Sequence, residues 1–135
     1  MIGVLVVTHG RLAMELVNAT KMIAGDMEHI QAVSIGWNDD VNDAHERMRS
    51  AVKQLDQGQG VLVLTDMFGG TPSNIALTFL EKDRVEVVTG VNLPMLIKLA
   101  SVQAEEGLRQ VAQKIRTQGQ KSIYVASEVL ARSES

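Results

Sequence analysis

The chain has 135 residues, of which 45% are hydrophobic, so it has the size of one domain with a buried core. Its net charge of −3 and its four aromatic residues argue against nucleic-acid binding, which uses basic surfaces and stacking rings. Cysteine is absent, which excludes disulfide scaffolds and thiol catalysis and fits a reducing cytoplasm. We therefore expect a single cytoplasmic domain that binds no nucleic acid.

The N-terminal segment does not have the features of a targeting signal. Residues 1–7 are apolar, but no basic residues precede them, and the polar residues Thr8 and His9 follow. This pattern predicts a strand rather than a signal peptide. No apolar run in the sequence approaches the ~20 residues needed to cross a bilayer.

Short apolar runs rich in β-branched residues alternate with segments of helical periodicity. The runs are residues 2–8, 30–35, 61–65 and 85–89, with a fifth at 123–126. This alternation predicts an α/β fold with an open, mostly parallel, doubly wound sheet, for which we take the strand order 2-1-3-4. The domain then covers residues 1–126, and residues 127–135 form a C-terminal tail.

Capping residues mark the ends of the predicted helices. Gly25 stands where the first helix would stop. Thr71-Pro72 predicts an N-cap followed by proline in the first turn, and Asn92-Leu93-Pro94 predicts a second such start. Residues 93–102 are apolar nearly all round, which predicts burial on every side and favours a subunit interface.

The candidate nucleophile is a histidine at the carboxyl edge of the predicted sheet. Open parallel sheets bind ligands beyond the carboxyl ends of their strands, where the strand order reverses. With the order 2-1-3-4 this point lies between strands one and three, so His9 and Asp66 would face each other. A carboxylate that holds one imidazole N–H leaves the other ring nitrogen free to attack. Because no G-x-S-x-G motif is present, His9 itself is the candidate nucleophile.

A glycine-rich turn beside this pair predicts a phosphate site. Glycines let backbone N–H groups approach an anion, a helix N-terminus attracts one, and hydroxyls add donors. Alone, such a turn is ordinary loop chemistry, and no G-x-x-x-x-G-K-[ST] motif indicates a nucleotide site. Together with the two edge residues it predicts that a phosphoryl group on His9 is bound by Gly69, Gly70, Thr71 and Ser73.

The remaining histidines, His29 and His45, do not follow strands and are predicted to be surface residues. The three histidines show no spacing typical of metal ligands. We therefore expect no metal site.

Three motifs together resemble the IIA component of the mannose-family (mannose/fructose/sorbose) sugar phosphotransferase systems. The motifs are Val7-Thr8-His9-Gly10, Asp66-Met67-Phe68-Gly69-Gly70-Thr71-Pro72 and Gly90-Val91-Asn92-Leu93-Pro94-Met95-Leu96. Each is short, but all three occur in order and after predicted strands, and the resemblance covers residues 1–126. Some members have Trp where this chain has Phe68 and Ser where it has Thr71. Both departures are mild, because the aromatic ring and the hydroxyl group are kept.

The resemblance implies a phosphotransferase that needs no cofactor. His9 would accept a phosphoryl group from the phosphocarrier HPr and pass it to a histidine of a IIB component. Asp66 would hold the other imidazole nitrogen, and Thr71 would lie near the phosphate. The membrane components IIC and IID would take part only indirectly.

The resemblance also implies an assembly. Members of the family are homodimers that exchange their last strand, which would place residues 123–126 antiparallel on the sheet of the partner. Some members continue into a IIB domain, whereas this sequence stops at Ser135. The IIB partner is therefore expected to be a separate protein.

Other functions share some of these features. Residues 66–71 are superficially similar to the D-x-x-G-T nucleophile motif of haloacid-dehalogenase-type hydrolases, but they contain an extra glycine, and Phe68 replaces the acid/base aspartate. The same fold could also act as a regulatory phosphocarrier or as the phosphoryl donor subunit of dihydroxyacetone kinase. The kinase subunit, however, has a Met-Gly-Ser type loop where this chain has residues 68–71.

Overall fold

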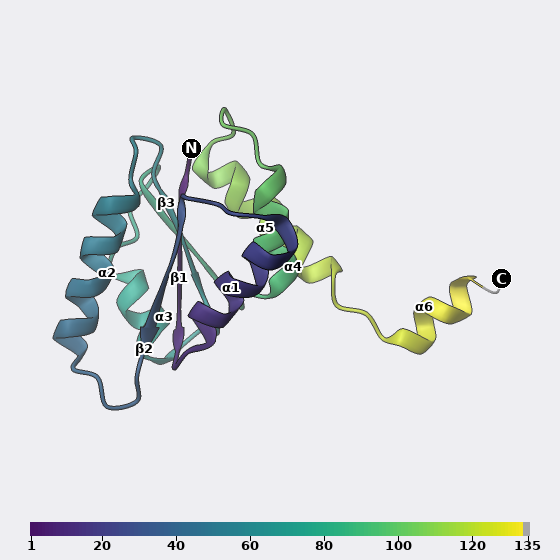
Figure 1. The fold of residues 1–135 in the computed structure, drawn as a ribbon, viewed down its shortest axis with the longest axis horizontal. Helices are drawn as coiled ribbons and strands as arrows, with labels where there is room; N and C mark the ends of the chain where they lie inside the picture. Colours follow the sequence, from purple (N-terminus) through teal and green to yellow (C-terminus); the bar gives the residue numbers. More distant parts are fainter. Residues whose placement is uncertain (134–135) are drawn as a thin grey trace.

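The computed structural model describes residues 1–133 and shows a four-stranded, all-parallel sheet in the order β2-β1-β3-β4 (Figure 1). The predicted α/β fold and strand order are confirmed. The strands are β1 (Gly3–His9), β2 (Ile30–Ile35), β3 (Val61–Thr65) and β4 (Val85–Thr89). The α-helices are α1 (Leu12–Ala24), α2 (Val41–Leu55), α3 (Gly70–Leu77), α4 (Leu93–Lys98), α5 (Leu108–Lys121) and α6 (Ala126–Ser133), and a 3₁₀ turn (Leu99–Ser101) follows α4. Across residues 1–133, no helix is long and apolar enough to cross a membrane.

Alternating side chains of the central strands build two hydrophobic cores, one on each face of the sheet. Val4 and Val6 of β1 pack in the core that includes α1, α4 and α5. Leu5 and Val7, which point the other way, pack in the core with α2 and α3. Figure 1 shows these two groups of helices on opposite sides of the strands. Because both faces are covered, β1 and β3 are apolar along almost their whole length.

Most helix boundaries follow the predicted capping residues. Gly25 ends α1, and the Asn92 side chain caps α4 by accepting a hydrogen bond from the Met95 N–H at 3.2 Å. The predicted start of α3 was wrong by two residues, since the helix begins at Gly70 and not after Thr71. The glycine before it adopts φ 88°, a conformation that turns the chain into the helix without a side-chain cap.

The segment after β4 is only partly buried within the single chain. Met95, Leu96 and Leu99 are buried, but Leu93 and Ile97 are only half-buried. The short helix α4 packs against α1 and α5, and these neighbours cover only part of its circumference. The predicted subunit interface would have to cover the rest of this segment, and it stays a prediction.

The predicted fifth strand is absent from residues 1–133. Residues 123–125 have no regular structure, and their side chains are exposed, with Ile123 at 76%. The helix α6 follows and extends away from the sheet (Figure 1). A strand needs a neighbouring strand for its hydrogen bonds, and this segment lies beside none. The predicted tail thus contains a helix, while Glu134 and Ser135 lie outside the described residues.

Candidate active site

His9 and Asp66 meet at the carboxyl edge of the sheet, as their positions in the sequence predict. His9 is the last residue of β1, and Asp66 directly follows β3. The two strands are hydrogen-bonded neighbours, with Val7 opposite Thr65. The strand order reverses here, because the chain passes from β1 to β2 on one side and to β3 on the other. This point is where open α/β sheets place their ligands.

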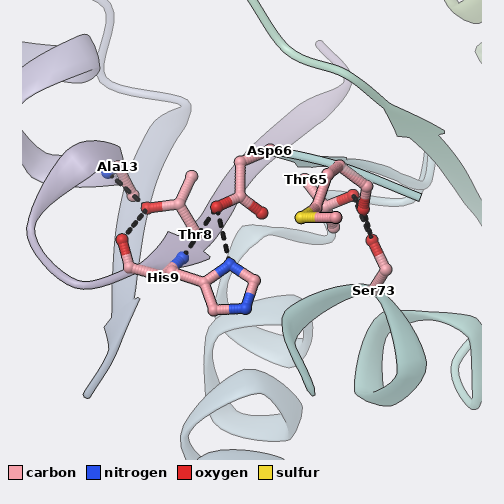
Figure 2. A network of polar contacts seen from close by, with 7 residues as sticks. Thr8, His9, Ala13, Thr65, Asp66 and Ser73 are labelled. Carbon is pink, nitrogen blue, oxygen red and sulfur yellow. Dashed lines mark hydrogen bonds and ion pairs between the residues drawn. The ribbon is translucent and has the colours of Figure 1, made fainter. Parts of the chain in front are cut away.

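One carboxylate oxygen holds His9 at two points (Figure 2). Asp66 Oδ2 accepts a hydrogen bond from His9 Nδ1 at 2.8 Å and another from the His9 backbone N–H at 3.0 Å. The other oxygen, Oδ1, is buried and has no hydrogen-bond partner among residues 1–133. The carboxylate therefore depends on His9 for its hydrogen bonds, and it fixes the imidazole ring in one orientation.

The charge on Asp66 determines which ring nitrogen of His9 can react. Burial raises the pKa of Asp66, but hydrogen bonds from the His9 backbone and ring, together with charge attraction, outweigh this effect and lower the pKa below its ordinary value of 3.8. Asp66 is thus ionised at neutral pH and can only accept hydrogen bonds. The proton of the neutral imidazole must then lie on Nδ1, which leaves Nε2 with a free lone pair.

The turn after β1 is held by a buried threonine. Thr8 Oγ1 accepts the backbone N–H of Ala13 at 2.6 Å and donates to the His9 carbonyl at 3.2 Å (Figure 2). The intervening Gly10 has φ 57°, a left-handed conformation that glycine adopts without steric cost. The first turn of α1 is thereby tied to the strand end that carries His9.

The two glycines after β3 bring the start of α3 against the imidazole. Gly69 and Gly70 have φ 88° and 82°, which side chains other than glycine rarely adopt. A Cβ atom on Gly70 would lie 3.1 Å from His9 Nε2 and 3.0 Å from His9 Cε1, whereas a Cβ on Gly69 would meet nothing within 4 Å. The N-terminal turn of α3 thus lies directly beside the free nitrogen.

The two predicted hydroxyl ligands occupy different environments. Thr71 is exposed in the first turn of α3. Ser73 is fully buried, and its hydroxyl contacts the Met67 carbonyl and, at 2.6 Å, Thr65 Oγ1 (Figure 2). These contacts brace the loop after β3, so the structure favours a supporting role for Ser73 over a direct phosphate contact.

The motif of residues 90–96 contacts the end of β3 through its backbone. The N–H groups of Gly90 and Val91 both donate to the Thr65 carbonyl at 2.9 Å, which fixes the end of β3 immediately before Asp66. Asn92 caps α4 and donates to the Gly119 carbonyl of α5 at 3.2 Å. This motif therefore supports the aspartate and connects it to two helices.

Trp37 was missed by the sequence reasoning. It lies in the loop between β2 and α2, and its ring stacks on the His9 ring with centroids 5.2 Å apart and an interplanar angle of 28°. The same rule that selected His9 and Asp66 could have found it, since it follows β2 at the same edge of the sheet.

The other histidines lie outside this arrangement. His45 on α2 stacks on Phe79 at 4.7 Å, and His29 precedes β2 at the opposite end of the strand. Within residues 1–133 there is no group of three or more His, Cys, Asp or Glu side chains that could hold a metal ion.

The chain belongs to the family described as PTS system fructose IIA component, whose family model matches residues 3–116. It is thus a mannose-family IIA component of a phosphotransferase system, a class of protein that takes part in phosphoryl transfer during sugar uptake. Membership of this family argues against the hydrolase alternative.

Individual relatives agree with this assignment. The fructose-specific EIIA component of Bacillus subtilis (strain 168) is 32% identical over 133 residues, which cover 98% of this chain and 91% of that protein. The mannose-specific EIIAB component of Escherichia coli (strain K12) is 32% identical over 98 residues, which cover 72% of this chain but only 30% of that longer protein. A solved structure, the PTS IIA protein associated with the fucose utilization operon of Streptococcus pneumoniae, superimposes with a TM-score of 0.84 at 30% identity over 95% of both chains.

Proposed function

We propose that this protein is a phosphohistidine carrier that accepts a phosphoryl group from HPr on His9 Nε2 and passes it to a IIB component. The observation that carries the proposal is the hydrogen bond from His9 Nδ1 to Asp66, which leaves Nε2 as the free nucleophile beside the start of α3. The transport proteins of the membrane, IIC and IID, would act after IIB and would not contact this site.

The transfer step uses the lone pair of Nε2. This lone pair attacks the phosphorus in line with the bond to the donor, and the electrons of the breaking bond leave with HPr. The proton stays on Nδ1, so the phosphorylated ring is positively charged and is stabilised by the ionised Asp66 in the ring plane. The reverse sequence, with IIB as the nucleophile, returns His9 to its neutral form.

The N-terminus of α3 supplies the anion site. Its first backbone N–H groups have no partners within the helix, and Gly69 as N-cap brings no side chain to occupy them. Gly70 lies close enough to Nε2 for this turn to meet the phosphoryl oxygens, with Thr71 as a further donor.

The proposal is tested by phosphorylation in a reconstituted relay. The protein is incubated with radiolabelled phosphoenolpyruvate, enzyme I and HPr, and the acid-labile label on the chain is measured. Wild type should be labelled, His9→Ala should lose all label, and His45→Ala, which removes a second stacked histidine, should keep it. Label that persists on the His9→Ala variant would overturn the assignment.

We further propose that the protein is a homodimer in which residues 123–126 pair with the open edge of β4 in the partner. Within residues 1–133 the strand β4 has β3 as its one neighbouring strand, with an additional bridge from its first residue, Val85, to Glu81, and a groove of about 610 Å³ lies between β4 and α5. Exposed Ile123, Tyr124 and Val125 offer an apolar extended segment for it. Analytical ultracentrifugation should give twice the chain mass; a monomer at all concentrations would overturn this proposal.

A further inference from the structure

Trp37 is the only tryptophan of the chain, and one face of its ring lies on the imidazole of His9. We propose that Trp37 is a positioning residue that stabilises the phosphorylated, positively charged form of His9 and so shifts the phosphoryl-exchange equilibrium toward this protein. The inference rests on the proposed function, because it concerns the imidazole that would carry the phosphoryl group.

Burial in the core does not hold Trp37 in place. Its side chain is 84% exposed, so its position depends on the loop that carries it and on the His9 ring. The loop is closed by Asp39, whose Oδ2 accepts the Gly36 N–H at 2.7 Å and a hydrogen bond from Arg47 at 2.8 Å. Arg47 also donates to the Ser34 carbonyl at the end of β2, at 3.0 Å. These contacts fix the loop so that the indole lies over the His9 ring, although the indole is not packed in the hydrophobic core.

The close approach of Asp39 to the backbone depends on Gly36. A Cβ atom at this position would lie 2.9 Å from Asp39 Oδ1. The turn that presents Trp37 is thus specified by Gly36, Asp39 and Arg47. Because Trp37 is exposed on a turn held by these contacts, its stacking on His9 cannot be explained by packing in the hydrophobic core.

The electrostatics of the stacked pair favour the charged ring. The face of an indole ring is electron-rich and attracts a cation more strongly than a neutral ring. Neutral His9 becomes a cation when Nε2 gains the phosphoryl group and Nδ1 keeps its proton. Asp66 approaches this cation at Nδ1, and Trp37 covers a ring face, so the two contacts are compatible and both strengthen upon phosphorylation.

The decisive measurement is the equilibrium constant for phosphoryl exchange between HPr and this protein. Trp37→Leu should lower the equilibrium constant by about 2- to 5-fold, the range expected for an exposed cation–π contact, and Trp37→Phe should retain most of it. A residue that only orients the ring would change the forward and reverse rates equally. An unchanged equilibrium constant in Trp37→Leu therefore overturns the inference, whatever happens to the rates.

The chain contains a matched control. Phe79 stacks on His45 with centroids 4.7 Å apart and the same interplanar angle of 28°. Phe79→Leu should leave the exchange equilibrium unchanged, and a decrease equal to that of Trp37→Leu would contradict a specific role for Trp37.

Proton NMR of the unphosphorylated protein tests the stacking on its own. The ring protons of His9 should move downfield in Trp37→Leu as the indole ring current is lost, and those of His45 should move only in Phe79→Leu. Unchanged His9 resonances in Trp37→Leu would overturn the stacking.

The outcomes also separate the inference from the proposed function. If HPr does not label wild type, the proposed function fails and the inference fails with it. If wild type is labelled and the equilibrium constant does not change in Trp37→Leu, only the inference fails.

Discussion

At the scale of single residues, the reactivity of His9 follows from one carboxylate oxygen. Asp66 Oδ2 accepts both the backbone N–H and Nδ1–H of the same residue, so it fixes the position and the tautomer of the imidazole together. The lowered pKa keeps this oxygen an acceptor, which places the proton on Nδ1 and the lone pair on Nε2. Orientation and proton location are thus set by a single pair of residues.

Asp66→Asn should lower the rate of phosphorylation by about 10²-fold or more, the usual size of an effect on a positioned proton. The amide can turn its NH₂ group toward Nδ1, which moves the imidazole proton to Nε2 and removes the nucleophilic lone pair. Rapid-quench labelling from phospho-HPr measures the rate. Asp66→Ala should also be slow with an unchanged circular dichroism spectrum, and wild-type rates in both variants would assign Asp66 a structural role only.

The same carboxylate should make stability depend on acid pH. Because folding lowers the pKa of Asp66 below 3.8, the ionised form stabilises the native state above that pH, and this contribution is lost as the pH falls through the lowered value. Asp66→Asn lacks it at every pH. The difference in free energy of unfolding between wild type and Asp66→Asn should therefore shrink from neutral pH to about pH 3 in urea titrations. A constant difference would contradict the assignment.

At the scale of elements, three chain segments meet beside β1 to form the site. The start of α3 contacts the His9 ring, the loop after β2 carries Trp37, and the turn after β4 holds the Thr65 carbonyl. Each arrives at the carboxyl edge of the sheet, because parallel strands deliver all their following loops to the same edge. The site is therefore a property of the topology as much as of any one loop.

Gly69 and Gly70, the N-cap and first residue of α3, allow backbone strain to be separated from steric blocking of His9. Gly69→Ala and Gly70→Ala both place a side chain at positive φ, and each should destabilise the fold by about 1–3 kcal/mol. Only Gly70→Ala also places a methyl group against His9 Nε2, so it alone should abolish most labelling. Urea unfolding and labelling together separate the effects, and equal labelling of both variants would show that Nε2 does not face this turn.

The topology and the central pair could be predicted from the sequence, whereas the local geometry of the loops could not. β-branched runs locate the strands, and the strand order then brings His9 and Asp66 together. The position of Trp37 after β2 places it at the same edge of the sheet, but the stacking of its ring on the imidazole depends on the turn closed by the Asp39–Arg47 contact, which only the folded chain creates. Thr71 is a residue type that commonly caps helices, and it was therefore predicted as the N-cap of α3. In the structure Gly69 is the N-cap, and the helix begins at Gly70.

At the scale of the whole molecule, helices cover both faces of the sheet, whereas its two outer strands, β2 and β4, are edge strands. Within residues 1–133, β4 pairs with one neighbouring strand, β3, and its first residue, Val85, also bridges to Glu81. The apolar residues 123–125 lie exposed in the same chain. A strand was predicted there because these residues are β-branched or aromatic, but within residues 1–133 the segment pairs with no strand, and its pairing with a partner is the proposal made above.

Two truncations test whether this segment completes the edge of a partner. A chain that ends at Ser122 lacks the apolar residues and should be monomeric, while a chain that ends at Ala126 keeps them without most of α6 and should remain a dimer. Sedimentation velocity distinguishes the two states. If both truncated chains behave alike, residues 123–125 are not the dimer contact.

A histidine with one free ring nitrogen would also set the order of the two phosphoryl-transfer steps in the proposed relay. Because Asp66 occupies Nδ1, the proposed phosphoryl donor and acceptor would both have to react at Nε2 and could not do so together. Under the proposed function the carrier would therefore be confined to a ping-pong cycle, in which HPr leaves before IIB enters. Under this constraint, tight binding of either protein would slow the flow of phosphate, so the surface around His9 is expected to form small, short-lived interfaces.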